Sequence, residues 1–195
     1  MWRILISTVL VLSPGAQILG HDTKAPPQNR CSAPEYRQMD FWLGDWDVYD
    51  NNGKLQGHNL IEKVLGACAL QEYYIDVSGL RATSFSMYDA SRRVWNQTYL
   101  SRFGTFITVE GYLQDKSMIM VGMHFTNEGR MALHRMIWTP NDNGTAYQLW
   151  NYSKDGGKTW ETIYEGFLRK ARKPFPRAEF NGRDFIDEGT QPNLR

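Results

Sequence analysis

The chain has 195 residues and carries 22 Lys and Arg against 21 Asp and Glu, which gives a formal net charge of +1. This balance provides no broad positive field, so we expect no nucleic-acid partner and no electrostatic attachment to anionic membranes. Without the first 20 residues, about 175 remain, which is the size of one domain with a substantial core.

Residues 1–20 have the pattern of an export signal. Arg3 supplies a positive charge, residues 4–12 form an apolar run, and Pro14 ends it. The run is shorter than the roughly 20 residues that a bilayer-spanning helix needs. We therefore predict a signal peptide cleaved near Gly20, with an uncleaved anchor as the alternative. The mature protein is then exported, to the periplasm or outside the cell, without a membrane span.

Residues 21–38 are polar and rich in proline, and they predict an extended N-terminal arm. The chain has two cysteines, Cys31 and Cys68. In an oxidising compartment, two cysteines favour a disulfide, which here ties the arm to the region after the second predicted strand. Two free buried thiols are the alternative.

Strand patterns dominate after a short helix expected over residues 35–43. The ten predicted strands span residues 46–49, 55–65, 69–77, 84–88, 94–100, 105–113, 118–125, 131–139, 146–152 and 160–169. Turn residues separate them, and no crossover helix intervenes. This order predicts an all-β, antiparallel up-and-down barrel or a sandwich. Aromatic residues make up 13% of the chain, and with ten strands they favour a closed barrel with an internal cavity over residues 39–170. Residues 171–195 predict a polar, irregular tail.

Gly44 and Trp46 resemble the Gly-x-Trp motif that opens the first strand of calycin (lipocalin-like) barrels. In that superfamily a basic side chain of the last strand covers the Trp ring and helps to close the barrel. The resemblance assigns that role to Arg169, which has Lys170 beside it. Trp42 and Trp46 are then expected to form the floor of the cavity.

A longer pattern resembles a family of largely uncharacterised bacterial proteins. It includes Phe-Trp-Leu-Gly-Asp-Trp-Asp-Val at 41–48, Gly-Ala-Cys-Ala-Leu-Gln-Glu at 66–72 and Ser-Lys-Asp-Gly-Gly-Lys-Thr-Trp at 153–160. The resemblance covers roughly residues 40–170 and implies a fold without an activity. The last of these motifs also matches the Asp-box of sialidase-like propellers. A single copy without a set of catalytic arginines favours a hairpin turn over a glycosidase.

Glu72 and Arg135 are the candidate polar groups of a cavity. Glu72 lies in an apolar and aromatic stretch, and burial in a cavity would raise its pKa. On the opposite strand phase it faces solvent. Arg135 alternates with apolar residues, and burial would require a carboxylate or an anionic ligand as its partner. We predict an internal Glu72–Arg135 pair, with an outward-facing Arg135 as the alternative.

Aromatic and polar residues share strand faces that predict a ligand-binding wall. Ser84, Ser86 and Tyr88 share one face of a strand, and Trp95, Gln97 and Tyr99 share one face of the next. The predicted ligand-binding residues are Trp42, Trp46, Glu72, Tyr88, Trp95, Gln97, Arg135, Trp138 and Trp150. The four histidines show no metal-binding spacing, so we predict neither a metal nor a cofactor.

The sequence thus favours an exported barrel that binds a small apolar or aromatic molecule. The alternative is an isomerase, cyclase or hydrolase in which Glu72 is the general acid or base and Arg135 stabilises an oxyanion. The third hypothesis is a structural, envelope-associated protein with a filled barrel.

Overall fold

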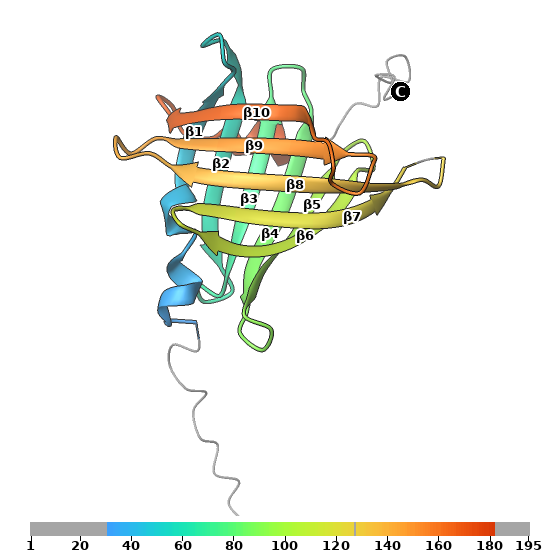
Figure 1. The fold of residues 1–195 in the computed structure, drawn as a ribbon. Helices are drawn as coiled ribbons and strands as arrows, with labels where there is room; N and C mark the ends of the chain where they lie inside the picture. The colour runs from blue at the N-terminus through green and yellow to red at the C-terminus, as the bar shows by residue number, and fades with distance from the viewer. Residues whose placement is uncertain (1–30, 127, 182–195) are drawn as a thin grey trace, which may run out of the picture.

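The computed structural model describes residues 31–126 and 128–181, which contain ten antiparallel strands closed into one barrel. The strands are β1 (Gly44–Tyr49), β2 (Leu55–Val64), β3 (Ala69–Asp76), β4 (Arg81–Asp89), β5 (Val94–Ser101), β6 (Phe106–Gln114), β7 (Ser117–Phe125), β8 (Met131–Pro140), β9 (Ala146–Ser153) and β10 (Glu161–Lys170). Each pairs with the next along the chain, and β10 returns to pair with β1. The predicted all-β up-and-down barrel is therefore confirmed. Strands β7 to β10 cross steeply over β2 to β5 (Figure 1).

The barrel has its core inside because its strands alternate between inward and outward side chains. In β4, Ala82, Ser84, Ser86 and Tyr88 are buried, and the residues between them are partly or fully exposed. Successive side chains of a strand point to opposite faces, so one strand face lines the interior. Tight turns connect the strands. In the turn after β1, the backbone N–H of Gly53 donates to Asp50 O, and the φ of 76° at Gly53 favours glycine.

Two short 3₁₀ segments, η1 (Pro34–Arg37) and η2 (Asp40–Trp42), replace the single helix expected over residues 35–43. They precede β1 at one end of the barrel (Figure 1). Residues three apart share a face of a 3₁₀ turn, and Met39 and Trp42 are both fully buried in the barrel core. The indole N–H of Trp46 donates to Trp42 O at 2.7 Å. We call residues 31–43 the closing segment, because they cover this end of the barrel.

The predicted disulfide between Cys31 and Cys68 is confirmed. It joins the closing segment to the β2–β3 turn. Arg37 reinforces this connection, since its Nη2 donates to Cys31 O at 3.1 Å and to Ala67 O at 2.6 Å. The closing segment is thus fixed covalently and by hydrogen bonds.

Lys170, and not Arg169, covers the ring of Trp46. The Nζ atom of Lys170 lies 3.6 Å from the ring centroid and donates to Leu43 O at 3.2 Å. Trp46 pairs with Lys170 across β1 and β10, whereas Arg169 pairs with Asp47. Because neighbouring residues of a strand face opposite ways, Arg169 points outward and covers Tyr49 instead, at 4.8 Å. The expected contact of Arg169 with Trp46 is therefore wrong, and the next residue, Lys170, makes it.

The chain beyond β10 carries a short helix, α1 (Arg177–Asn181), where the sequence predicted an irregular polar tail. Phe175 and Phe180 pack against Tyr73 on the outer side of β3, in a small second cluster with Leu60 and Ile75. Two aromatic residues in a polar segment are too sparse a pattern to predict this contact. Within the described ranges, no helix has the length and apolar character needed to cross a membrane.

Candidate functional site

The end of the barrel opposite the closing segment contains a cavity of about 680 Å³. Residues of the β1–β2, β3–β4 and β5–β6 turns form its mouth, including Asp50, Ser78 and Phe103. Its deeper lining comes from β3, β5, β9 and β10. The up-and-down topology explains this arrangement, because alternate turns gather at the same end of the barrel.

Glu72 is the buried carboxyl group of this cavity. Its side chain projects inward from β3 and is 5% exposed. The Nδ2 atom of Asn59 donates to one carboxyl oxygen at 2.8 Å, and the Oγ atom of Ser84 donates to the other at 2.6 Å. The ladder explains the contacts, because β3 pairs with β2 on one side and places Ser84 of β4 directly opposite Glu72 on the other. Of the two strand phases left open by the sequence, the structure has the inward one.

Burial raises the pKa of Glu72 above its ordinary 4.5, because a low-dielectric environment disfavours the charged form. The hydrogen bonds from Ser84 and Asn59 act in the opposite direction, since both donors stabilise the carboxylate. Gln97 extends the network by donating to Ser84 Oγ at 3.3 Å and to Ser86 Oγ at 3.0 Å. Glu72 is thus a buried carboxyl group that Asn59 and Ser84 hold in one position.

Aromatic side chains form the walls above Glu72. Tyr99 and Trp150 are in edge-to-face contact with ring centroids 5.3 Å apart, and Tyr74 and Tyr164 are in a similar contact at 6.3 Å. Desolvation raises the pKa of Tyr74, Tyr99 and Tyr164, so these phenols stay protonated at neutral pH. Gly166 provides space for one of them, because a Cβ atom there would lie 2.6 Å from the Tyr164 hydroxyl oxygen.

Trp150 is held in place by His134. Its indole N–H donates to His134 Nδ1 at 2.8 Å, and this bond requires an unprotonated Nδ1 atom. Burial lowers the pKa of His134 to about 4, and the nearby His124 contributes in the same direction. The imidazole is therefore neutral at physiological pH and acts as a fixed acceptor for Trp150.

Arg135 lies outside the barrel, and the predicted Glu72–Arg135 pair does not form. Its guanidinium lies 4.1 Å from the ring centroid of Trp160, and its Nη2 atom donates to Asn151 Oδ1 at 3.2 Å. His134 and Met136, its neighbours on β8, are buried on the inward face, so Arg135 must face outward. The oxyanion role expected of Arg135 beside Glu72 thus lacks its geometry.

The other predicted ligand-binding residues lie outside the cavity lining, except Trp150. The packed core contains Trp42, Trp46, Tyr88, Trp95 and Trp138. Trp42 and Trp138 are in ring contact at 5.6 Å, and Trp95 donates from its indole N–H to Gln38 at 3.0 Å. The sequence predicted Trp42 and Trp46 as the floor of the cavity and Tyr88, Trp95 and Trp138 as its lining, because it gives no measure of depth along the barrel.

Tyr74, Gln148 and Tyr164 line the cavity but were absent from the predicted set. Tyr74 follows Glu72 by two residues, so it shares the inward face of β3 and was accessible to sequence reasoning. Gln148 shares an inward face with Trp150 in the same way. Tyr164 carries no such signal, because Glu161, Thr162 and Ile163 beside it are exposed and show no alternation.

The Asp-box pattern forms the β9–β10 turn. Ser153 donates from its hydroxyl to Asp155 Oδ1 at 2.8 Å, and the same oxygen accepts the backbone N–H of Thr159 at 2.9 Å. The hydroxyl of Thr159 donates to Asp155 Oδ2 at 2.7 Å, and this bond, followed by the other two, lowers the pKa of Asp155 to about 2. Trp160 then leaves the turn and packs against Arg135. The motif therefore has a structural part in connecting two strands, as the sequence favoured.

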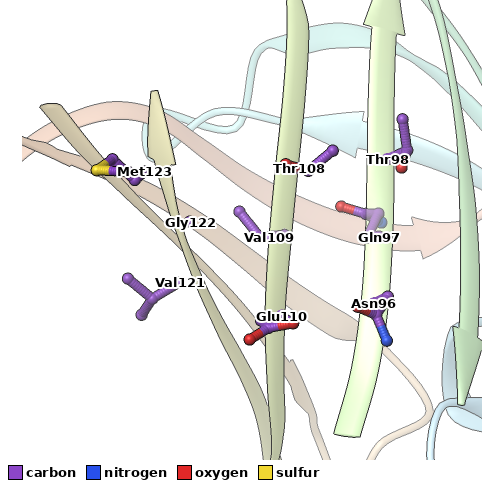
Figure 2. Close-up of a pocket in the computed structure, with 9 residues that line it drawn as sticks. All are labelled: Asn96, Gln97, Thr98, Thr108, Val109, Glu110, Val121, Gly122 and Met123. Atoms are coloured by element: carbon purple, nitrogen blue, oxygen red, sulfur yellow. The ribbon is translucent and has the colours of Figure 1, made fainter. Parts of the chain in front are cut away.

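A second, smaller hollow of about 340 Å³ lies where β5, β6 and β7 run side by side. Figure 2 shows its lining residues, with Asn96, Thr108 and Met123 on the three strands. The β6–β7 ladder ends at the pair Glu110 and Val121. Glu110 is already paired with Arg92 at 2.7 Å. This hollow has neither a buried charged group nor an aromatic wall.

No protein-family model matches the chain, and no curated protein matches its sequence. The closed barrel agrees with a calycin-like architecture. Membership of the bacterial family stays a prediction. Over the described part of the chain, no three His, Cys, Asp or Glu side chains come together as metal ligands would.

Proposed function

We propose that this protein binds a small aromatic molecule in the cavity above Glu72. The single observation that carries the proposal is a cavity of about 680 Å³ with a buried carboxyl group and aromatic walls. Small-molecule sites are concave and mostly apolar, and they place a few polar groups to orient the ligand. Glu72 and Gln148 are such groups here, since both are buried and line the cavity.

The arrangement favours binding over a filled structural barrel. The half of the barrel near the closing segment is packed with Trp, Met and Leu side chains, whereas the half near the mouth is open. Burying Glu72 there costs stability relative to an apolar residue, because an apolar residue would pack without a desolvation penalty. A ligand-orienting role accounts for this cost.

Native mass spectrometry of protein purified from its own host tests the proposal. We expect a peak at the mass of the ligand-bound protein. The Leu80→Trp variant should show a smaller ligand-bound fraction, because Leu80 lines the mouth and a larger side chain narrows it. Leu100→Trp is the matched control, since Leu100 is partly exposed on the outer face of β5. If the wild-type protein shows only its apo mass, or if both variants behave alike, the cavity is not the binding site.

We also propose that the protein is exported. Residues 1–20, which carry the predicted signal peptide, lie outside the described residues. The Cys31–Cys68 disulfide supports the proposal, because such bonds persist in oxidising compartments. Sequencing the N-terminus of the protein from its host is the test. Cleavage near Gly20 is expected, and an intact N-terminus in the cytoplasm contradicts export.

A further inference from the structure

The charged residues that line the cavity all have the same sign. The charged side chains that face it are Asp50, Glu72 and Asp76, and none of the described lining residues is Lys, Arg or His. Asp76 lies at the mouth, where its Oδ1 atom accepts the backbone N–H groups of Ser78 and Leu80. Glu165 borders the cavity from β10, but its carboxylate lies on the outer face, where it accepts the hydroxyl of Tyr147 at 2.6 Å. Glu72 is the most buried of the three inward carboxyl groups.

When Glu72 is ionised, the cavity therefore contains negative charge that no positive lining side chain offsets. Burial raises the pKa of Tyr99, and the negative charges of Glu72 and Asp76 act in the same direction. An anionic ligand would meet the same repulsion, and Arg135 cannot neutralise it from the outer face. The cavity thus disfavours carboxylates and phenolates.

Glu72 also has unused capacity to accept hydrogen bonds. A carboxylate offers about four acceptor positions on its two oxygens, and Asn59 and Ser84 occupy one on each. The neighbouring Asn59 Oδ1 atom is buried without a hydrogen-bond partner among the described residues. Glu72 lines the cavity, so a donor from the ligand is the chemistry complementary to its free acceptor positions.

We infer that the ligand is an aromatic molecule with a positively charged nitrogen, which contacts Glu72 while its ring packs between Tyr99, Trp150 and Tyr164. This inference rests on the proposed function and specifies its ligand class. Aromatic side chains attract organic cations through their quadrupole, and a buried carboxylate adds a charge-assisted hydrogen bond. A bare metal ion is the wrong occupant, because such an ion needs several ligating groups and the described residues form no cluster of them.

Three probes with the same ring separate the possibilities: naphthylmethylamine, naphthylmethanol and naphthoate. Isothermal titration near neutral pH measures their affinities for the full mature protein. We expect the amine, which is a cation, to bind at least about tenfold more tightly than the alcohol, and naphthoate to bind most weakly. Glu72→Gln should remove the preference for the amine and leave alcohol binding almost unchanged.

The matched control is Glu161→Gln, which makes the same substitution at an exposed residue outside the cavity and should retain the preference. The wild-type comparison stands by itself if Glu72→Gln fails to fold. Equal or tighter binding of the alcohol or of naphthoate overturns the cationic class and leaves the proposed cavity binding intact. Binding of none of the three, in a protein that also carries no ligand from its host, overturns both.

Discussion

At the scale of single residues, the contribution of Glu72 to the stability of the fold depends on its protonation state. A buried carboxyl group with two hydrogen-bond donors can exist in both forms, because desolvation favours the acid and the donors favour the carboxylate. The net effect raises the pKa, so Glu72 takes up a proton more readily in the folded protein than in the unfolded chain. A cationic ligand would favour the carboxylate. Ligand binding and proton release are then coupled at the Glu72 carboxyl group.

The raised pKa makes a prediction about stability. Between pH 4.5 and the folded-state pKa, the folded protein keeps a proton that the unfolded chain has lost, so stability falls as pH rises through this interval. The slope from this one group is at most about 1.4 kcal/mol per pH unit. We expect the free energy of unfolding of Glu72→Gln, relative to wild type, to increase as pH rises above 4.5.

Urea denaturation at a series of pH values measures this difference. Glu161→Gln is again the control for the chemistry of the substitution, because its side chain lies on the exposed surface. A Glu72→Gln difference that stays constant across the series would mean that Glu72 titrates alike in the folded and unfolded states. Its burial would then have no electrostatic consequence.

At the scale of elements, the contact between β1 and β10 closes the barrel. Lys170 on the last strand lies over Trp46 on the first and also donates to Leu43 O. It therefore connects three parts of the chain: β10, β1 and the closing segment. Burial lowers the pKa of Lys170, and the negative charge of Asp45 partly offsets this lowering.

Lys170→Met tests this contact. We expect it to lower the free energy of unfolding by about 1 kcal/mol, the size of a cation–π contact near the surface. Arg169→Met is the matched control, because Arg169 covers the half-buried Tyr49 and makes no contact with Trp46. Thermal or urea unfolding compares the two variants. A larger loss from Arg169→Met would show that closure depends on the outer contact instead.

The elements themselves were largely predictable from sequence, and the site was less so. Turn residues such as Asn52 and Gly53 and the alternation of β4 identify strands from local chemistry alone. Whether Glu72 or Tyr73 faces inward depends on the register of the whole barrel, because both faces of β3 carry apolar residues. The outer face is covered by Phe175 and Phe180, and no local pattern near β3 predicts this packing.

The dependence on register also explains why the predicted contact of Arg169 with Trp46 and the predicted Glu72–Arg135 pair were wrong. Arg169 and Lys170 are adjacent basic residues at the end of a strand, and only the pairing with β1 decides which of them faces Trp46. Both faces of β8 carry apolar residues near Arg135, such as Met136 and Ile137, so alternation gave no preferred phase. The structure assigns it to the outer face, where Trp160 provides its partner.

At the scale of the whole molecule, the barrel divides into a packed half and an open half. The closing segment, Trp46, Trp95 and Trp138 fill the first, and the cavity with Trp150 occupies the second. The chain has seven tryptophans, and the six among the described residues lie in different parts of the structure, so their signals report on different regions. Trp160, on the outer side, is a reference for nonspecific contact.

The most direct test of cavity binding is an NMR titration that follows the indole N–H signals while naphthylmethylamine or naphthylmethanol is added. We predict a saturable shift of the Trp150 signal, because its N–H bonds to His134 beside the cavity. The signals of Trp46, Trp95 and Trp138 in the packed half should change little, and that of Trp160 should not change. No shift of Trp150 at saturating probe, or a saturable shift confined to Trp160, would contradict a ligand inside the barrel.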